Sequence, residues 1–267
     1  MTTKTLTERQ QHERDEYNAR AATMPIAKVD LDHFAHKRFG PWSPYWTVFD
    51  FVRSKYPPPE HKLLNYGCGT GSSALIYANL GYTVWAFDIA EGLIDIARRS
   101  AQQHGLGERT IFSAQPAESL DYDDDSFDIV VGEDVLHHVE LARALPELYR
   151  VLKPGGAAIF KDSLATPIRD SIRRRPPISW LLPYGTKNRL CGKKYIPTPD
   201  EHPLTESELA LMFAQFPKME VKRFHVLALL AKIFSNRAFF ERCDWAMFRI
   251  FPFLRRFGDN IVIILKK

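Results

Sequence analysis

The stretch Lys62-Leu63-Leu64-Asn65-Tyr66-Gly67-Cys68-Gly69-Thr70-Gly71 decides the fold of this chain. A short apolar run leads into three glycines at alternate positions, and a helix-like segment follows over residues 72–80, so the order is strand, tight turn and helix. Because glycine has no Cβ, such a turn lets the backbone approach a ligand and leaves amide groups at the helix N-terminus to meet a polar or anionic group. The stretch therefore predicts a nucleotide-type binding turn.

The glycine spacing separates this turn from two better-known ones. It reads G-x-G-x-G, whereas the dinucleotide fingerprint is G-x-G-x-x-G and the phosphate loop continues into lysine. Seventeen residues after Gly71, an apolar segment ends in Asp88, where a second parallel strand would deliver a carboxylate beside the first turn. A carboxylate at this place can accept both hydroxyls of a ribose. The alternative role of Asp88 is to cap the helix that begins near Glu91.

Helical spacing recurs along the chain. Residues 46–56 have apolar side chains at helical intervals and are stopped by three prolines, while residues 91–104 form a second such segment, closed by Gly105. A helix over 140–152 is ended by Lys153-Pro154-Gly155-Gly156. Thr205 with Glu208 three residues later predicts a capping box that opens a helix up to Phe216.

Short strand-like runs alternate with these helices, at residues 110–113, 128–131, 157–160, 219–225 and within 259–267. Strands that alternate with helices in this way indicate an α/β protein with a parallel sheet. We therefore expect the carboxyl ends of the strands to form the ligand-binding edge.

Five motifs carry a family resemblance, in the order 64–71, 87–89, 126–130, 135–139 and 148–156. Together they resemble the class I S-adenosylmethionine-dependent methyltransferases, in particular the small-molecule branch that includes ubiquinone and menaquinone methyltransferases. The resemblance implies a doubly wound, seven-stranded, mostly parallel sheet of Rossmann-like methyltransferase type, with the last strand antiparallel beside the fifth. It also implies an N-terminal helical lid and a C-terminal helical insertion.

The expected organisation follows from that resemblance. Residues 1–60 are assigned to the helical lid or cap, in which Tyr17 lies in a polar, helix-permissive segment. Residues 61–267 are assigned to the S-adenosylmethionine-binding methyltransferase domain. Within that domain, residues 162–205 and 226–257 are expected to be insertions on the substrate side.

The cofactor implied by the resemblance is S-adenosyl-L-methionine, which would leave as S-adenosyl-L-homocysteine. The matching motif positions give the expected binding residues, which are Asn65, Gly67, Cys68, Gly69, Gly71, Asp88, Ile89, Pro116, Ala117, Glu118 and Glu133.

Two of these positions depart from the family pattern. Asn65 stands where an acidic residue is usual, although its side-chain oxygen can still accept from the cofactor's ammonium group. Pro116 stands where the family usually has an aspartate that contacts the adenine amino group. Gln115 or Glu118 could substitute for that aspartate, and the backbone N–H of Ala117 could meet the adenine ring.

Four titratable residues follow the fourth predicted strand, namely Glu133, Asp134, His137 and His138. A histidine at this place could deprotonate an acceptor hydroxyl, because its pKa lies near working pH. His138 and His137 are the candidate catalytic bases, and His138 is preferred because the family pattern most often keeps the second histidine. The alternative is that one histidine only packs against the following helix or caps it.

The acceptor side is expected to be lipophilic or anionic. In the family the segment after the fifth strand often lines the acceptor pocket, which makes candidates of Trp180, Tyr184, Arg189, Lys194, Tyr195 and His202. Residues 226–257 are apolar and aromatic, with arginines interleaved. They predict either two helices that cover the sheet edge, or a basic amphipathic surface for peripheral membrane contact or a lipophilic substrate.

Composition and charge set further bounds. The 267 residues carry a net charge of +4, and residues 161–267 hold 20 Lys and Arg against 10 Asp and Glu. Such asymmetry suits an anionic partner, although a solvated surface has the same composition. Three distant cysteines offer neither a disulfide framework nor a metal spacing, so no metal is expected. The polar start and the lack of a long apolar run predict a cytoplasmic protein.

The predicted function is transfer of a methyl group from S-adenosylmethionine to a small hydrophobic acceptor, with oxygen or carbon as the favoured target. An NAD-dependent oxidoreductase lacks its glycine pattern here. A nucleic-acid methyltransferase lacks its Asn/Asp-Pro-Pro-aromatic motif, because Gly132-Glu133-Asp134-Val135 stands in that place. The open alternative is a protein that keeps the fold and binds the cofactor, but performs non-methylating chemistry or binding only.

Overall fold

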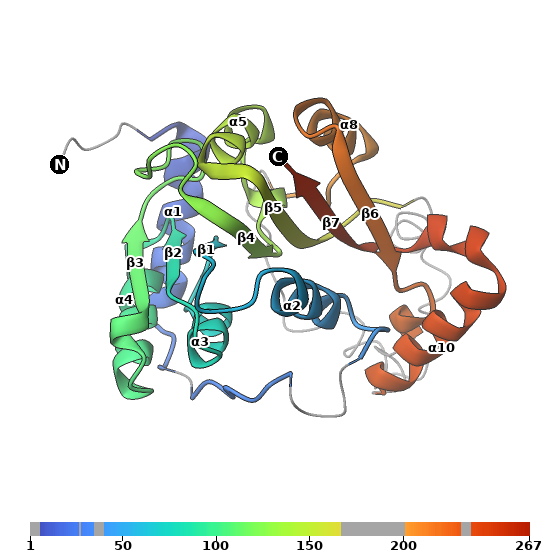
Figure 1. Cartoon of the computed structure of the whole chain (residues 1–267), viewed down its shortest axis with the longest axis horizontal. Helices are drawn as coiled ribbons and strands as arrows, with labels where there is room; N and C mark the ends of the chain where they lie inside the picture. Colours follow the sequence, from blue (N-terminus) through green and yellow to red (C-terminus); the bar gives the residue numbers. More distant parts are fainter. Residues whose placement is uncertain (1–5, 27, 35–39, 167–200, 231–235) are drawn as a thin grey trace.

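The computed structural model describes residues 6–26, 28–34, 40–166, 201–230 and 236–267. Its centre is a seven-stranded sheet in the order β3-β2-β1-β4-β5-β7-β6 (Figure 1). The strands are β1 (Leu63–Tyr66), β2 (Val84–Asp88), β3 (Thr110–Ala114), β4 (Phe127–Glu133), β5 (Leu152–Ser163), β6 (Lys218–Phe224) and β7 (Asn260–Lys266).

The direction of the strands confirms the predicted topology. β1 pairs in parallel with β2 and β4, β2 with β3, and β4 with β5. β7 runs antiparallel to both β5 and β6. The register sets Tyr66 beside Phe87 on one side and beside Gly132 on the other. The carboxyl ends of β1, β2 and β4 therefore meet at one edge of the sheet, as expected for a doubly wound fold.

Helices cover both faces of the sheet. One buried cluster joins the sheet to α2 (Pro44–Lys55), α3 (Ser72–Asn79) and α4 (Glu91–Gln103), and a second joins it to α5 (Leu141–Val151) and α8 (Glu206–Gln215). α1 (Glu8–Ala21) does not reach the sheet core and instead packs on α4 through Ala21, Leu93 and Ile96. Short 3₁₀ helices η1 (Gly107–Arg109) and η2 (Leu136–His138) complete this half.

Local sequence signals fix several helix starts. The capping box before α8 forms as predicted, since the Thr205 hydroxyl accepts from the Glu208 N–H and the Glu208 carboxylate accepts from the Thr205 N–H. α2 begins two residues earlier than the apolar spacing indicated, because Ser43 caps it and Pro44 occupies its first position. β5 is longer than residues 157–160, because Leu152 already pairs with Phe127 of β4.

The region 226–257 differs from the two predicted helices. Its described residues form one α-helix, α10 (Arg237–Ile250), between two short 3₁₀ helices, η4 (Leu227–Leu230) and η5 (Pro252–Phe257). The Asp244 carboxylate accepts hydrogen bonds from the N–H groups of Val226, Leu227 and Ala228, at 3.0, 2.7 and 2.9 Å. These bonds hold the first segment as a turn on α10. None of the helices in the described ranges has the length and apolarity to cross a membrane.

Candidate functional site

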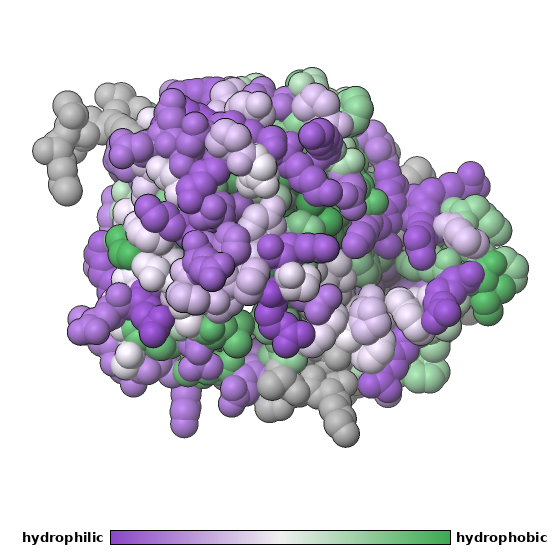
Figure 2. Space-filling model, in the orientation of Figure 1, coloured by the Kyte–Doolittle hydropathy of each residue, from purple (hydrophilic) through white to green (hydrophobic). Residues whose placement is uncertain are grey.

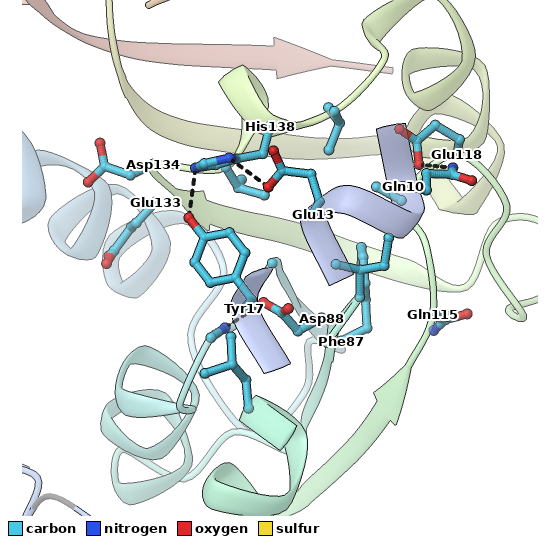
Figure 3. A pocket seen from close by; sticks show the side chains of 17 residues that line it. Gln10, Glu13, Tyr17, Phe87, Asp88, Gln115, Glu118, Glu133, Asp134 and His138 are labelled. Carbon is cyan, nitrogen blue, oxygen red and sulfur yellow. Dashed lines mark hydrogen bonds and ion pairs between the residues drawn. The ribbon is translucent and has the colours of Figure 1, made fainter. Parts of the chain in front are cut away.

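The carboxyl ends of β1, β2 and β4 line a cavity of about 220 Å³ that α1 covers (Figure 3). Eight of the predicted site residues line it, namely Gly67, Gly69, Asp88, Ile89, Ala117, Glu118, Glu133 and His138. Asn65, Cys68, Gly71, Pro116 and His137 do not. Gln115, which the sequence offered as a substitute adenine contact, also lines the cavity. The remaining lining residues were not assigned to the cofactor site from the sequence, and those are Gln10, Glu13, Tyr17, Phe87, Leu93, Asp134, Val135 and Val139.

The three glycines of the turn have different surroundings, although all three have positive φ, at 65°, 53° and 83°. A Cβ on Gly67 would lie 2.2 Å from Cγ2 of Val135, and one on Gly71 would lie 2.8 Å from Cβ of Ala97. A Cβ on Gly69 would meet no atom within 4 Å. Gly67 and Gly71 therefore allow close packing, whereas the backbone of Gly69 faces open space in the cavity.

Asp88 is fixed beside this turn by two backbone amides. Its Oδ2 accepts from the Gly69 N–H at 2.9 Å and its Oδ1 from the Ala90 N–H at 3.1 Å. Burial raises the pKa of Asp88, and these two hydrogen bonds oppose that shift. The carboxylate thus lies at the cavity wall at the end of β2, the position predicted for it.

Asn65 and Cys68 lie behind the cavity wall. Asn65 is buried and donates from Nδ2 to the Val131 carbonyl at 3.3 Å, and its Oδ1 has no hydrogen-bond partner among the described residues. Burial raises the pKa of the Cys68 thiol well above its ordinary value. Its small side chain packs in the buried cluster that joins the sheet to α2, α3 and α4.

The loop expected at the adenine end uses its polar side chains internally. The Gln115 amide donates to the Ser113 hydroxyl at 2.9 Å and accepts from the Asp121 N–H at 2.7 Å. The Glu118 carboxylate accepts from the Glu140 N–H at 2.9 Å. Both residues offered as substitutes for the family aspartate are thus engaged in holding this loop.

The helix α1 closes the cavity with polar side chains (Figure 3). Gln10 donates from Nε2 to Oε2 of Glu118 at 2.7 Å, and the Glu13 and Tyr17 side chains approach His138. Gln10, Glu13 and Tyr17 repeat at i, i+3 and i+7, which places them on one face of the helix. That spacing was the available signal for the two residues, Gln10 and Glu13, that sequence reasoning missed.

The two histidines separate in the structure. His138 lies at the cavity, with Nδ1 3.2 Å from Oε2 of Glu13 and Nε2 3.4 Å from the Tyr17 hydroxyl. His137 does not line the cavity, because its Nδ1 lies 2.6 Å from Oδ1 of the fully buried Asp162. Asp162 also accepts from the Leu136 N–H at 2.9 Å. This pairing turns the His137 ring away from the cavity.

The environment of His137 favours its protonated form. Burial alone would lower the pKa of His137, but the hydrogen bond and the charge of Asp162, together with the charge of Glu201, raise it above its ordinary value. The ligand atoms of His137, His138 and Glu201 lie within 4.8 Å of one another. Two imidazoles and a carboxylate suit a divalent cation, so the expectation of a metal-free site stays a prediction.

Glu133 lines this cavity and also a second one, of about 530 Å³. The Ser73 hydroxyl donates to its Oε2 at 2.9 Å, and burial raises the pKa of Glu133. The second cavity lies between residues 28–34, residues 43–45, the start of α3 and the start of α10. Glu133 therefore stands between a cavity on the glycine turn and a larger one beside it.

Asp134 organises the wall next to Glu133. It has a positive φ of 53°, which is uncommon for a residue with a side chain. Lys161 Nζ lies 2.6 Å from its Oδ1, and the Tyr45 hydroxyl donates to its Oδ2 at 3.0 Å. Burial would lower the pKa of Lys161, but the Asp134 charge raises it. The ion pair between Asp134 and Lys161 thus holds the backbone that follows β4 in place.

Of the predicted acceptor residues, His202 lies within the described part of the chain. Trp180, Tyr184, Arg189, Lys194 and Tyr195 lie outside the described residues. His202 is described, and it lies on the surface with half of its side chain exposed and Nε2 3.9 Å from Glu208. It lines neither of these two cavities, and its place in the acceptor wall stays a prediction.

The sheet order, the glycine turn and the carboxylate at the end of β2 define an α/β protein of the doubly wound class. Residues 64–160 match the family model described as a methyltransferase domain. Over this stretch the chain is similar to methyltransferases, as the ordered motifs predicted.

Individual proteins show the same likeness. A demethylmenaquinone methyltransferase from Clavibacter sepedonicus is 34% identical over 124 residues, which are 46% of this chain and 49% of that protein. The chain thus spans about half the length of that curated relative.

Solved structures share the fold. A SAM-dependent methyltransferase from Methanosarcina mazei has a TM-score of 0.52 at 23% identity, covering 81% of this chain and 96% of its own. The (4+2)-cyclase SpnF has a TM-score of 0.55 at 18% identity, covering 98% and 97%.

Proposed function

We propose that this protein transfers a methyl group from S-adenosylmethionine to a small hydrophobic acceptor, at an oxygen or a carbon atom. One observation carries the proposal: the Gly69 backbone borders open space beside the Asp88 carboxylate, at the edge where β1, β2 and β4 end. An extended nucleoside can pass over such a turn only where no side chain intervenes. The domain match at 64–160 supports the same reading.

The residues present fit this cofactor. Asp88 can accept both ribose hydroxyls. Because Asn65 lies behind the cavity wall, its buried Oδ1 would accept from an ammonium group through water. Because Gln115 and Glu118 are engaged elsewhere, the backbone N–H of Ala117 is the proposed contact for the adenine ring. Pro116, Cys68 and Gly71 then shape the turn and its loop without touching the ligand.

When bound, S-adenosylmethionine supplies a methyl group already activated on a sulfonium. The chain's own task is to hold donor and acceptor in line and to exclude water. The helix α1 helps to exclude water, because its Gln10 and Tyr17 side chains cover the cavity. Glu133 stands where the two cavities meet, so we place the acceptor in the second cavity or at its junction with the first.

An oxygen acceptor would need to lose a proton, and His138 is the proposed base. Its Nε2 faces the Tyr17 hydroxyl at the cavity and is the atom that would take the proton. The Glu13 carboxylate near Nδ1 would hold the proton on that nitrogen, leaving Nε2 unprotonated and stabilising the imidazolium afterwards. A carbon acceptor that is already nucleophilic would not need His138 to remove a proton. His137 is a positioning residue, held by Asp162.

A second candidate function is non-methylating chemistry on the same fold. The specific observation is the match to the (4+2)-cyclase SpnF over 98% of this chain. Such a protein would keep the cofactor cavity while its reaction lies elsewhere.

The test combines turnover with a matched pair of variants. The protein is incubated with S-adenosylmethionine and a panel of lipophilic phenols and quinols, and S-adenosylhomocysteine is measured. Methyl transfer is expected from the wild type, with a loss of about 10²-fold or more in His138→Asn if an oxygen is methylated. His202→Asn, on the surface, serves as the control. Cofactor binding without turnover on any acceptor would favour the second candidate.

A further inference from the structure

The helix α10 buries charged side chains and exposes apolar ones. Its buried side carries two carboxylates, Glu241 and Asp244, which are 7% and 2% exposed. Glu241 pairs with Arg237 at 2.6 Å and lies 3.3 Å from His225, while Asp244 holds the amides of the preceding turn. The only other buried residue of this helix is Phe248. The two buried carboxylates of α10 therefore make their contacts within the protein.

The outer side of α10 and the following 3₁₀ helix carry large apolar side chains instead. Phe239 is 55% exposed, Ile250 70%, Phe251 49% and Phe253 62%. Phe239 and Ile250 are eleven residues apart, three helical turns, so they lie on one face of the helix. Exposed apolar residues that gather in this way mark an interaction site more often than isolated ones do.

Arginines flank these apolar residues. Arg242 and Arg249 are exposed on the same outer side, and Arg255 and Arg256 are exposed on η5. The Arg242 guanidinium lies over the Trp42 ring at 4.7 Å, and that of Arg249 over the Trp245 ring at 4.8 Å. Residues 236–257 contain no other carboxylate than Glu241 and Asp244. The outer face is thus apolar and cationic, with its acidic groups turned inward.

This surface lies at one end of the molecule. α10 stands beyond the edge strand β6, far from β3 at the opposite edge (Figure 1). Figure 2 shows hydrophobic and hydrophilic side chains interleaved at the same end. A planar partner could therefore approach it without meeting the lid helix α1.

We propose that this face docks on an anionic lipid bilayer. It is the α10–η5 face, formed by Phe239, Arg242, Arg249, Ile250, Phe251 and Phe253. Aromatic and aliphatic side chains enter the boundary between headgroups and acyl chains, while arginines meet anionic headgroups. The charge complementarity selects this partner, because the face offers cations and no exposed carboxylate.

The second cavity lies on the inner side of the helix that carries the docking surface. Arg237, Ala238 and Glu241 at the start of α10 line that cavity, and Glu133 in the same cavity also borders the cofactor turn. An acceptor dissolved in the bilayer would then enter close to the site of transfer. This last step rests on the proposed function, whereas docking itself does not.

The test is co-sedimentation of the full chain with vesicles. Binding is expected to vesicles of phosphatidylglycerol and phosphatidylcholine in equal parts, to be much weaker on phosphatidylcholine alone, and to fall as salt is raised. Arg249→Ala should weaken binding about fivefold. Ile250→Glu and Phe253→Glu should weaken it about tenfold or more, because a charge replaces an inserted apolar group.

The matched control is Phe213→Glu on α8, since Phe213 is 56% exposed but lies on a helix with the acidic Glu206 and Glu208. This variant should bind vesicles like the wild type. S-adenosylmethionine binding and thermal unfolding of each variant show that the fold is intact, which keeps a failure of docking distinct from a failure of the cofactor site.

Three results would overturn the proposal. The wild type could fail to bind anionic vesicles, or Ile250→Glu and Phe213→Glu could weaken binding equally. Light scattering could also show a dimer that Ile250→Glu dissociates, which would assign the face to a second copy of the chain.

Discussion

Replacing Gly69 with alanine separates ligand binding from packing at the glycine turn. The φ of 53° at Gly69 costs an alanine about 1–2 kcal/mol, but the added Cβ meets no atom within 4 Å. For a chain of this size, such a loss lowers Tm by about 2–8 °C. The methyl group would, however, project from the backbone that we place against the cofactor. Gly69→Ala should therefore fold and should bind S-adenosylmethionine about tenfold more weakly, or worse.

The matched comparison is Gly71→Ala, which has the opposite pattern. Its Cβ would lie 2.8 Å from Cβ and 3.3 Å from Cα of Ala97, so α4 would have to move. Backbone strain and overpacking together cost about 2–5 kcal/mol. Thermal unfolding and calorimetric titration of both variants provide the measurements. Unchanged cofactor affinity in Gly69→Ala would refute the reasoning, because the ligand could not then lie on this backbone.

Three further predictions concern the lid and the histidines. Gln10→Ala removes the 2.7 Å contact to Glu118 and should weaken cofactor affinity a few-fold with a small change in Tm, which titration and melting would detect; an affinity equal to that of the wild type would show that α1 does not close over the ligand. Asp162→Asn should lower the free energy of unfolding by about 3–5 kcal/mol in urea titrations, because buried His137 loses its charged partner; a loss below 1 kcal/mol would contradict this pairing. Since the fold raises the pKa of His137 above its ordinary 6.5, its contribution to stability is fully present below pH 6.5 and is lost as pH rises through the folded value. The unfolding midpoints of wild type and Asp162→Asn should thus come closer together at higher pH. If the difference between the two midpoints is the same at every pH, His137 does not lose its proton in this range.

The sequence was sufficient for features that depend on local chemistry. The glycine turn and Asp88 could be predicted because a strand that ends in alternate glycines leaves few other conformations. The capping box of Thr205 and Glu208 depends on residues three positions apart. The sheet arrangement, with the last strand antiparallel beside the fifth, was implied by the family resemblance and not by local signals.

Features that depend on distant partners could not be predicted. Gln10 and Glu118 are 108 positions apart, and the helical spacing of Gln10 with Tyr17 does not identify Glu118 as the partner that buries it. His137 and His138 are adjacent in sequence, and only the position of Asp162 on β5 decides which of them faces the cavity. The orientation of α10 depends in the same way on the amides that Asp244 reaches.

The most direct test of the cofactor assignment is calorimetric titration of the wild type and Asp88→Ala with S-adenosylmethionine and S-adenosylhomocysteine. Saturable binding of both ligands to the wild type is predicted, weakened about tenfold or more in the variant, which loses the ribose contact. A folded wild type that binds neither ligand would contradict the account.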